Sequence, residues 1–355
     1  MTLTKRLFKN GSTVLALAMF IFCFVSSAIG GKEESAQSSR GLHLGLKLSG
    51  GAGFLLNGAG DLERFRSGRA QYVSDYRQNP GYSSAFDWKK LSVIPDFNAE
   101  IILYLGRHFG IGVGTGFCQA TSKGNYSIQG STSQSSWWGT FTETETDKFA
   151  QNYRIQAIPI TLNLYYFLPL GYSQKFNLYF YGGVGYYFAK LTHDFKNDYS
   201  YAYEDDSWYY YNEKENYQFN SAAKETSKQN RVGFRSGLGL EMNLTSFISF
   251  GFEVFGRLVN FSNWAGDYAD SWTARDQLWQ ERLGWYYDQT STGSSSEHGN
   301  LFTYNVKDNQ LTKNYPAMWI WQSAPGGSDI SGVKKATINL NTFGALISLR
   351  LRFGL

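Results

Sequence analysis

The sequence contains little cysteine, little charge and few long apolar runs. Of its 355 residues, two are cysteine and 17% are charged. A mean hydropathy of −0.36 excludes a polytopic helical membrane protein, because such a chain needs several apolar runs of about 20 residues. The chain is rich in other residues, with 38 glycines and 17% aromatic residues. This composition argues against disorder and favours a β-protein.

The N-terminus has the layout of a secretory signal peptide. Three basic residues precede an apolar stretch over 14–25, and small residues follow it. A stretch of this length is too short to span a membrane as a mature helix. We therefore expect 1–30 to be a signal peptide, cleaved after Ala28 or Gly30, and 31–40 to be a short polar segment.

Removing this peptide changes the charge and the cysteine content of the mature chain. The peptide holds three basic residues and no acidic ones, so the formal net charge falls from +4 to about +1 (4 − 3). The basic isoelectric point therefore gives no reason to expect nucleic-acid binding. Cys23 is removed as well, which leaves Cys118 alone and allows no intrachain disulfide. An exported chain of this kind must take its stability from another source.

Period-two alternation of apolar and polar or glycine residues dominates the rest of the chain. Such alternation is typical of strands with one apolar face. It predicts eight strands and no convincing amphipathic helix between them. The predicted strands lie at 42–48, 93–105, 109–117, 157–168, 177–188, 231–244, 248–258 and 343–353.

The connections between these strands alternate in length. Short turns are expected at 106–108, 169–175 and 245–246, whereas the other connections are long and lie near 57–92, 122–152, 192–229 and 263–335. Outer-membrane barrels have this arrangement, with short periplasmic turns and long exterior loops. The sequence thus predicts an all-β, eight-stranded antiparallel up-and-down transmembrane β-barrel over 41–355, with both termini in the periplasm. Its apolar face would contact lipid, and closure would pair every backbone group. The alternative is a secreted β-sandwich.

Several strands resemble those of a known group. The residues concerned are Ile158-Pro159-Ile160-Thr161-Leu162, Tyr181-Gly182-Gly183-Val184-Gly185-Tyr186, Gly237-Leu238-Gly239-Leu240-Glu241 and Ser348-Leu349-Arg350-Leu351-Arg352-Phe353. They resemble the small eight-stranded outer-membrane barrels of the OmpA/OmpX/OmpW-like and PorT-like superfamily. In that group the aromatic residue usually ends the chain, whereas Gly354 and Leu355 follow Phe353 here. The resemblance covers about half of the mature chain. It implies location in the outer membrane of a Gram-negative (diderm) bacterium, and insertion by the barrel-assembly machinery.

Charged residues on the polar strand faces are expected to point into the barrel. An eight-stranded barrel is just wide enough for side chains to fill its interior. Opposite charges would pair across the lumen, because an unpaired buried charge is costly. This predicts a lumen filled by side chains, with a gated polar path as the alternative. The predicted lumen network comprises Glu100, Glu241, Glu253, Arg231, Arg235, Arg257, Arg350 and Arg352.

No motif predicts catalysis, a metal or a cofactor. The four histidines, His43, His108, His193 and His298, have no Ser or carboxylate placed by local spacing as a catalytic set. We expect His193 and His298 to lie in exterior loops as solvated residues. No His/Cys cluster has ligand spacing, and 204–206 lacks the alternation of a calcium loop. The glycines at 110–116 do not form GxGxxG.

The long connections are rich in Tyr and Trp among Ser, Asn and Gly, a composition common at recognition surfaces. The alternating Thr and Glu over 137–147 predict a hairpin that continues above the membrane. A binding surface for a partner or glycan and an aromatic cap over the barrel both remain open. The predicted loop surface comprises Trp137, Trp138, Trp208, Tyr209, Tyr210, Trp285, Trp319 and Trp321.

Together these features predict a non-enzymatic outer-membrane barrel whose aromatic loops serve structure or binding. The alternatives are a narrow channel for small or hydrophobic solutes, and an accessory barrel of a secretion or envelope assembly. The expected partners are outer-membrane lipid, the barrel-assembly machinery, and a surface ligand or an envelope protein. No nucleic acid and no cofactor is expected.

Overall fold

The computed structural model describes residues 42–137, 139–170, 175–207 and 212–354. The predicted signal peptide 1–30 and the segment 31–40 lie outside this range. Within it, no helix is long and apolar enough to cross a membrane.

The fold is an antiparallel β-barrel closed by a ring of strand pairings. Each ring strand pairs with the next, and the last pairs with the first. In the part of the chain that the structure describes, the ring has eight members. The prediction of an all-β antiparallel barrel is confirmed. The ring strands, in order, are β1 (Leu42–Leu55), β3 (Val93–Leu105), β4 (Phe109–Ser136), β5 (Gly139–Leu170), β6 (Phe176–Asp205), β7 (Glu213–Asn243), β8 (Ile248–Leu258) and β15 (Thr342–Gly354).

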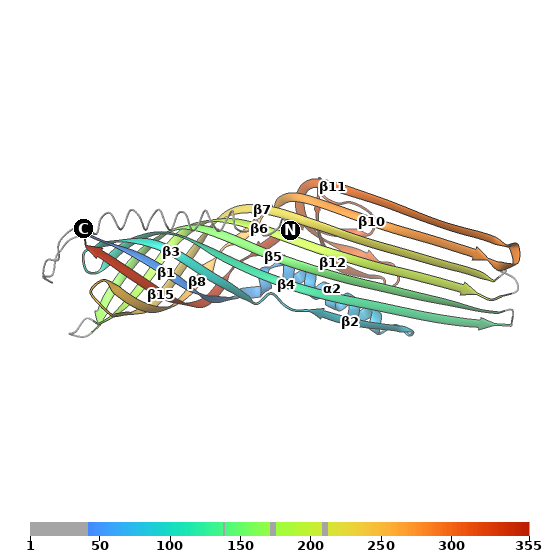
Figure 1. Cartoon of the computed structure of the whole chain (residues 1–355), viewed down its shortest axis with the longest axis horizontal. Helices are drawn as coiled ribbons and strands as arrows, with labels where there is room; N and C mark the ends of the chain where they lie inside the picture. Colours follow the sequence, from blue (N-terminus) through green and yellow to red (C-terminus); the bar gives the residue numbers. More distant parts are fainter. Residues whose placement is uncertain (1–41, 138, 171–174, 208–211, 355) are drawn as a thin grey trace.

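Four ring strands continue far past the barrel on one side. β4, β5, β6 and β7 are 28, 32, 30 and 31 residues long, against 11 to 14 for the other ring strands. Figure 1 shows the barrel at one end of this long sheet. We call the part of the sheet that lies beyond the barrel the extension. The connections predicted at 122–152 and 192–229 are therefore largely strand, and Ser136 pairs with Gly139 at the tip of the predicted 137–147 hairpin. The apolar residues change from the outward to the inward face partway along these strands, so the outer halves do not continue the apolar alternation of the barrel and were not predicted.

The 263–335 connection is also mostly strand, and it widens the extension. β10 (Ala265–Gln280) pairs with β7, β11 (Trp285–Asp308) with β10, and β12 (Lys313–Trp321) with β11. The remaining strands are short: β2 (Tyr82–Trp88) on β4, β13 (Ile330–Lys335) on β11, and the pair β9 (Asn260–Ser262) and β14 (Thr337–Asn339). The 3-10 turns are η1 (Leu56–Ala59) and η2 (Glu281–Leu283).

A helix that the sequence analysis did not predict, α2 (Asp61–Arg77), lies within the 57–92 connection. It packs against β2 and β12. Leu62, Phe65 and Val73 are buried along one side, but two buried aspartates interrupt this apolar pattern. Asp61 accepts a hydrogen bond from the backbone N–H of Thr337 (2.8 Å) and contacts Lys334. Asp75 accepts one from Tyr315 (2.7 Å) and contacts Lys313. These partners come from distant strands, so the local sequence does not reveal that the aspartates are tolerated.

The polarity of the two sheet faces reverses along the long strands. On β5, the outward side chains from Ile158 to Leu164 are apolar and exposed, while the inward Asn163 is polar and buried. Farther along the same strand the outward Arg154 is exposed, and the inward Tyr153 is fully buried. The backbone alternates without a break, so the reversal reflects residue type alone. The barrel is apolar outside, and the extension is apolar inside.

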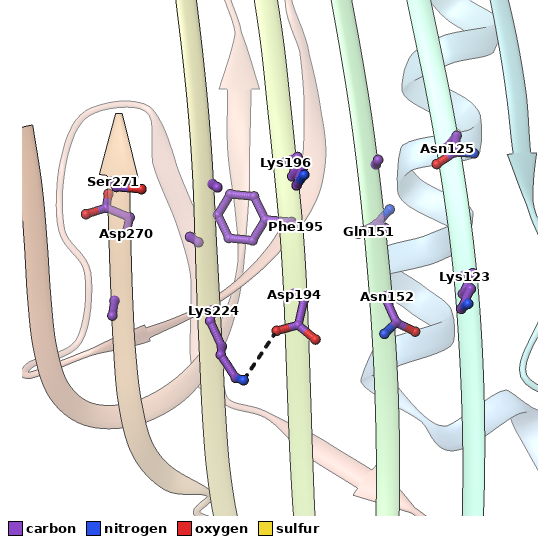
Figure 2. Close-up of a pocket in the computed structure, with 14 residues that line it drawn as sticks. Lys123, Asn125, Gln151, Asn152, Asp194, Phe195, Lys196, Lys224, Asp270 and Ser271 are labelled. Atoms are coloured by element: carbon purple, nitrogen blue, oxygen red, sulfur yellow. Dashed lines mark ion pairs between the residues drawn. The ribbon is translucent and has the colours of Figure 1, made fainter. Parts of the chain in front are cut away.

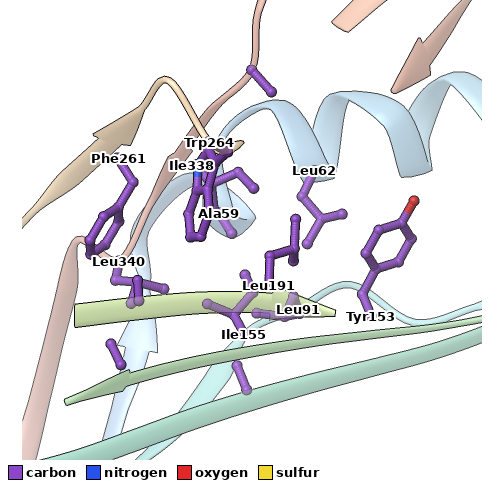
Figure 3. Close-up of a cluster of buried hydrophobic side chains, with 14 of the residues drawn as sticks. Ala59, Leu62, Leu91, Tyr153, Ile155, Leu191, Phe261, Trp264, Ile338 and Leu340 are labelled. Atoms are coloured by element: carbon purple, nitrogen blue, oxygen red, sulfur yellow. The ribbon is translucent and has the colours of Figure 1, made fainter. Parts of the chain in front are cut away.

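The largest apolar core lies at the end of the barrel that meets the extension. It contains Leu55 and Ile94 from the ends of β1 and β3, Ala157 from the middle of β5, and Leu62 and Phe65 from α2. Figure 3 shows part of this core, with Leu62 of α2 facing side chains of the long strands below it. We call this cluster the cap.

Candidate functional site

The barrel interior holds three groups of paired charges. The group nearest the short turns centres on Glu241 of β7. Arg350 and Arg352 of β15 both contact its carboxylate, Arg352 Nη2 at 2.6 Å from Oε1, and Ser249 donates a further hydrogen bond to it. Glu241 and Arg350 are each 1% exposed. The pairing satisfies charges that would be costly to bury alone.

The middle group joins Lys47 of β1 to Glu253 of β8. Their Nζ and Oε2 atoms are 2.7 Å apart, and both side chains are nearly inaccessible. The ammonium lies 5.0 Å from the centre of the Tyr181 ring and 5.4 Å from those of Tyr165 and Tyr179. Such contacts stabilise a desolvated cation. Tyr165 in turn donates a hydrogen bond to Glu100.

The group nearest the cap centres on Asp96 of β3. Arg257 Nη1 lies 2.6 Å from one carboxylate oxygen, and Arg235 Nη1 lies 3.8 Å from the other. Arg235 also donates to Asn98 (2.7 Å) and stacks over Phe255 at 4.5 Å. All three groups together extend along the interior from the turns to the cap.

The predicted lumen residues do not all join these groups. Glu100, Glu241, Glu253, Arg235, Arg257, Arg350 and Arg352 point into the interior. Arg231 does not: it is exposed, where β7 has left β8 and not yet met β10. Its assignment to the lumen was wrong because strand phase alone cannot show where a neighbouring strand ends. Lys47 and Asp96 also lie in the interior and were not among the predicted lumen residues, although both are on the polar face of their predicted strands.

His193 and His298 each contact one carboxylate side chain. No group of three or more His, Cys, Asp or Glu side chains in the part of the chain that the structure describes could hold a metal. His193 is fully buried, contrary to the expectation of a solvated loop residue. Its Nδ1 lies 2.8 Å from a Glu225 oxygen, and its ring stacks on Tyr153 at 3.8 Å. It therefore packs the interior of the extension. His298 is exposed and contacts Asp267.

The predicted aromatic surface is divided by the structure. Trp138, Trp208, Tyr209 and Tyr210 lie outside the described residues. Trp137 is 83% exposed, and Trp285 (48%) stacks on Tyr287. Trp319 packs against Phe195 and His193, so it belongs to the interior of the extension, and Trp321 contacts Tyr304. Among the described residues of the set, Trp319 therefore does not share an exposed surface with Trp137 and Trp285.

A different set of aromatic residues gathers on the inner face of the extension near its tip. Trp272 of β10 stacks on Phe219 of β7 with ring centres 6.2 Å apart. Together with Tyr217, Tyr287 and Asp276 they line a cleft of about 370 Å³. Alternation along β7, β10 and β11 places them on one face, but the partner strands could not be known from the sequence. We call this feature the tip cleft.

The inner face beside the tip cleft is acidic. Glu145 and Asp147 of β5 lie on it, as do Glu215 of β7 and Asp276 of β10. Burial raises the pKa of Asp147 to about 6, and the charge of Glu145 adds to this increase. Partial burial also raises the pKa of Glu215, as do the nearby charges of Asp276 and Glu213.

Comparison with known proteins gives structural similarity only. No protein-family model and no curated protein sequence matches the chain. The chain is similar to the outer membrane protein OprG from Pseudomonas aeruginosa, at 12% identity and a TM-score of 0.32, over 90% of this chain and 100% of OprG. It is also similar to the outer membrane transporter YddB from Escherichia coli (6% identity, TM-score 0.10, covering 87% and 80%) and to the siderophore receptor PirA from Pseudomonas aeruginosa (9%, 0.08, covering 90% and 81%). The barrel is established by the ring of strand pairings.

Proposed function

We propose that this protein is a sealed outer-membrane β-barrel that carries a tall binding sheet outside the membrane. The reversal of polarity along β4–β7 is the observation that supports this best. A ring with an apolar exterior suits hydrocarbon, and a sheet with a polar exterior suits water. An exposed apolar surface as extensive as that of the ring would be a liability in a soluble monomer.

The proposed route to the membrane follows the expectations from the sequence. The chain is exported with a signal peptide that is cleaved after Ala28 or Gly30, and the barrel-assembly machinery inserts it into the outer membrane of a Gram-negative bacterium. The short turns then lie in the periplasm, and the extension lies outside the cell. The proposed role is non-enzymatic and uses no cofactor.

The lumen is proposed to be closed. The three charge groups lie along its length, and the cap lies at its outer end. Conductance of the full mature protein in planar lipid bilayers tests this. We expect no steady openings once the protein has inserted. Protease protection of the barrel would verify the insertion. Steady ion-selective openings would show a narrow channel instead.

The tip cleft is proposed as the binding surface of the extension. Aromatic rings beside a carboxylate and an amide suit a ligand with both apolar and hydrogen-bonding faces, such as a sugar. A panel of immobilised glycans probed with the purified protein tests this. Trp272→Ala should abolish any binding, whereas Trp279→Ala should not, because Trp279 is on the opposite face of β10. If the wild type binds no glycan, or if both variants bind equally, a glycan-binding role for the cleft is wrong.

A further inference from the structure

The outer face of the extension becomes basic directly beyond the apolar exterior of the barrel. On β6, Phe188 is the last outward aromatic residue, at 42% exposure, and the next outward residue is Lys190. Two residues of a strand span about 7 Å. Lys190 pairs across the strands with Lys228 of β7, so two exposed lysines lie side by side at this boundary.

These two lysines have no acidic partner among the described residues. The ion pair nearest to them in sequence on this face joins Lys224 to Asp194 at 3.9 Å. Like charges placed directly across neighbouring strands destabilise a sheet. An anion supplied from outside the protein would remove this repulsion. Arg154 faces outward on β5 and pairs with Thr192, which lies between Lys190 and Asp194 on β6. It adds to the positive charge.

A groove begins four residues farther from the barrel on the same face. It has a volume of about 660 Å³. Its floor is made of small residues, Ala150, Ala222 and Ala269, which leave space between longer side chains. Figure 2 shows the labelled polar residues around it, with α2 behind the strands. Three lysines, Lys123, Lys196 and Lys224, line it together with Asp194 and Asp270, and Lys224 is paired with Asp194. We call it the basic groove.

The walls of the basic groove also offer hydrogen-bonding groups. Asn125, Asn152 and Ser271 line it. The Asn152 Oδ1 atom is buried and has no hydrogen-bond partner in the described structure. A buried acceptor of this kind is costly unless a ligand or water donates to it. An excess of lysines over aspartates, two amides and a floor of small residues together suit a phosphorylated sugar.

The positive charge is local to this face. The mature chain carries a net charge of only about +1, counting +4 for the whole chain less the three basic residues of the predicted signal peptide. The inner face at the tip is acidic instead, with Glu145, Glu215 and Asp276. A general attraction of the protein to anions therefore does not explain the arrangement. The basic residues lie where the outward face changes from apolar to polar.

We propose that this face binds a phosphorylated glycolipid of the outer leaflet. Lys190 and Lys228 contact the phosphates of the lipid headgroup, and the basic groove holds the sugars that continue outward from it. The proposal rests on the membrane position given under the proposed function. Its occupant is a lipid rather than a free phosphate, because the lysines adjoin the apolar exterior that the acyl chains would cover.

Native mass spectrometry of the full mature protein in detergent, titrated with lipid A, tests the lysine pair. We expect Lys190→Gln with Lys228→Gln to weaken binding about thirtyfold, since each basic residue near an anionic surface contributes about fivefold. The matched control removes the same charge elsewhere, with Lys214→Gln and Lys307→Gln, and should stay within about twofold of the wild type. Equal binding by the two double variants, or full retention with dephosphorylated lipid A, would overturn the proposal. Displacement by an equal concentration of inorganic phosphate would also contradict it.

The basic groove is tested with a longer ligand. Ala222→Phe would fill the floor, and we expect it to weaken binding of rough lipopolysaccharide, which carries inner-core sugars, about tenfold. Binding of lipid A alone should not change. Ala202→Phe, outward on β6 but nearer the tip, is the control. If Ala222→Phe changes neither ligand, the groove has no part in binding. If the protein fails to insert into vesicles at all, the proposed function fails, whereas insertion without lipid A binding overturns only this inference.

Discussion

The barrel and the extension are built from the same strands but have opposite cross-sections. In the barrel half of β5, Leu162 and Leu164 face outward and are 48% and 63% exposed, and Asn163 is buried. In the extension half, Arg154 faces outward and Tyr153 is buried. The surrounding medium, rather than the backbone, decides which face of a continuous ladder is apolar. The point where the phase of the apolar residues changes therefore marks the proposed membrane boundary.

The two regions also hold their interiors together differently. The barrel interior uses charge pairs and tyrosines, such as Lys47 with Glu253. The interior of the extension uses apolar and aromatic packing of α2 against the sheet, as with Phe65, Trp88 and Tyr153. A buried polar interior tolerates loss of one partner poorly, whereas an apolar core loses stability in proportion to the volume removed.

Breaking one charge pair in the barrel should have the largest effect. Glu253→Ala leaves Lys47 buried and uncompensated, and we expect it to lower the free energy of unfolding by about 3–5 kcal/mol. Urea unfolding in lipid vesicles measures the change. The double variant Lys47→Met with Glu253→Leu should recover most of the loss. If the single variant costs no more than the double variant, the pair does not hold the interior.

A charge placed on the outward face distinguishes the two regions directly. Leu162→Arg puts a cation on the barrel exterior and should destabilise it by about 2–4 kcal/mol. Thr144→Arg lies on the same face of the same strand, in the extension, where residue 144 is exposed, and should change stability by less than about 0.5 kcal/mol. The heat-modifiable gel shift of the barrel and urea unfolding report both. Equal tolerance of the two variants would disprove a lipid-facing exterior.

Asp147 should make the extension, but not the barrel, sensitive to pH. Its pKa is about 6 in the folded protein, mainly because of burial, against 3.8 when exposed. A carboxyl with a raised pKa binds more protons when folded, so stability falls as pH rises from about 4 to 6 and stays low above that. Asp147→Asn should therefore stabilise the extension near pH 7.5, on the order of 2 kcal/mol. The gain should vanish near pH 4.

Hydrogen exchange of β5 and β6 amides, compared between variant and wild type at each pH, measures this effect. Amides of the barrel half of the same strands are the internal control. A gain that is independent of pH would show that Asp147 acts through packing instead.

The smallest effect is expected at the tip. Trp137 is 83% exposed at the turn between β4 and β5, so Trp137→Ala should change stability by less than about 0.5 kcal/mol. Thermal unfolding followed by circular dichroism checks this. A larger loss would show that the turn packs against another part of the protein.

The period-two pattern predicted the ring strands well, because each ring strand has one apolar face. The pattern failed where the apolar residues change from the outward to the inward face of a strand. The predicted strands end near Phe117 and Phe188, but apolar residues continue on the inward face from Cys118 and Leu191. A search for such reversals could have found the extension. The helix α2 was missed because Asp75 lies on its buried side. Lys47 and Asp96, the lumen partners of Glu253 and Arg257, were not predicted because these pairs depend on how strands distant in sequence are aligned.

The uninterrupted pairing of β5 with β6 fixes the distance between the barrel and the tip of the extension. From Phe188 to Asp205 the ladder spans about 55 Å along the strand, at about 3.3 Å per residue. The height of the tip is then set by residue count rather than by a flexible linker. Because faces alternate with every residue, this height can evolve only in steps of two residues on each strand. A single-residue deletion in both β5 and β6 would exchange their inner and outer faces beyond that point.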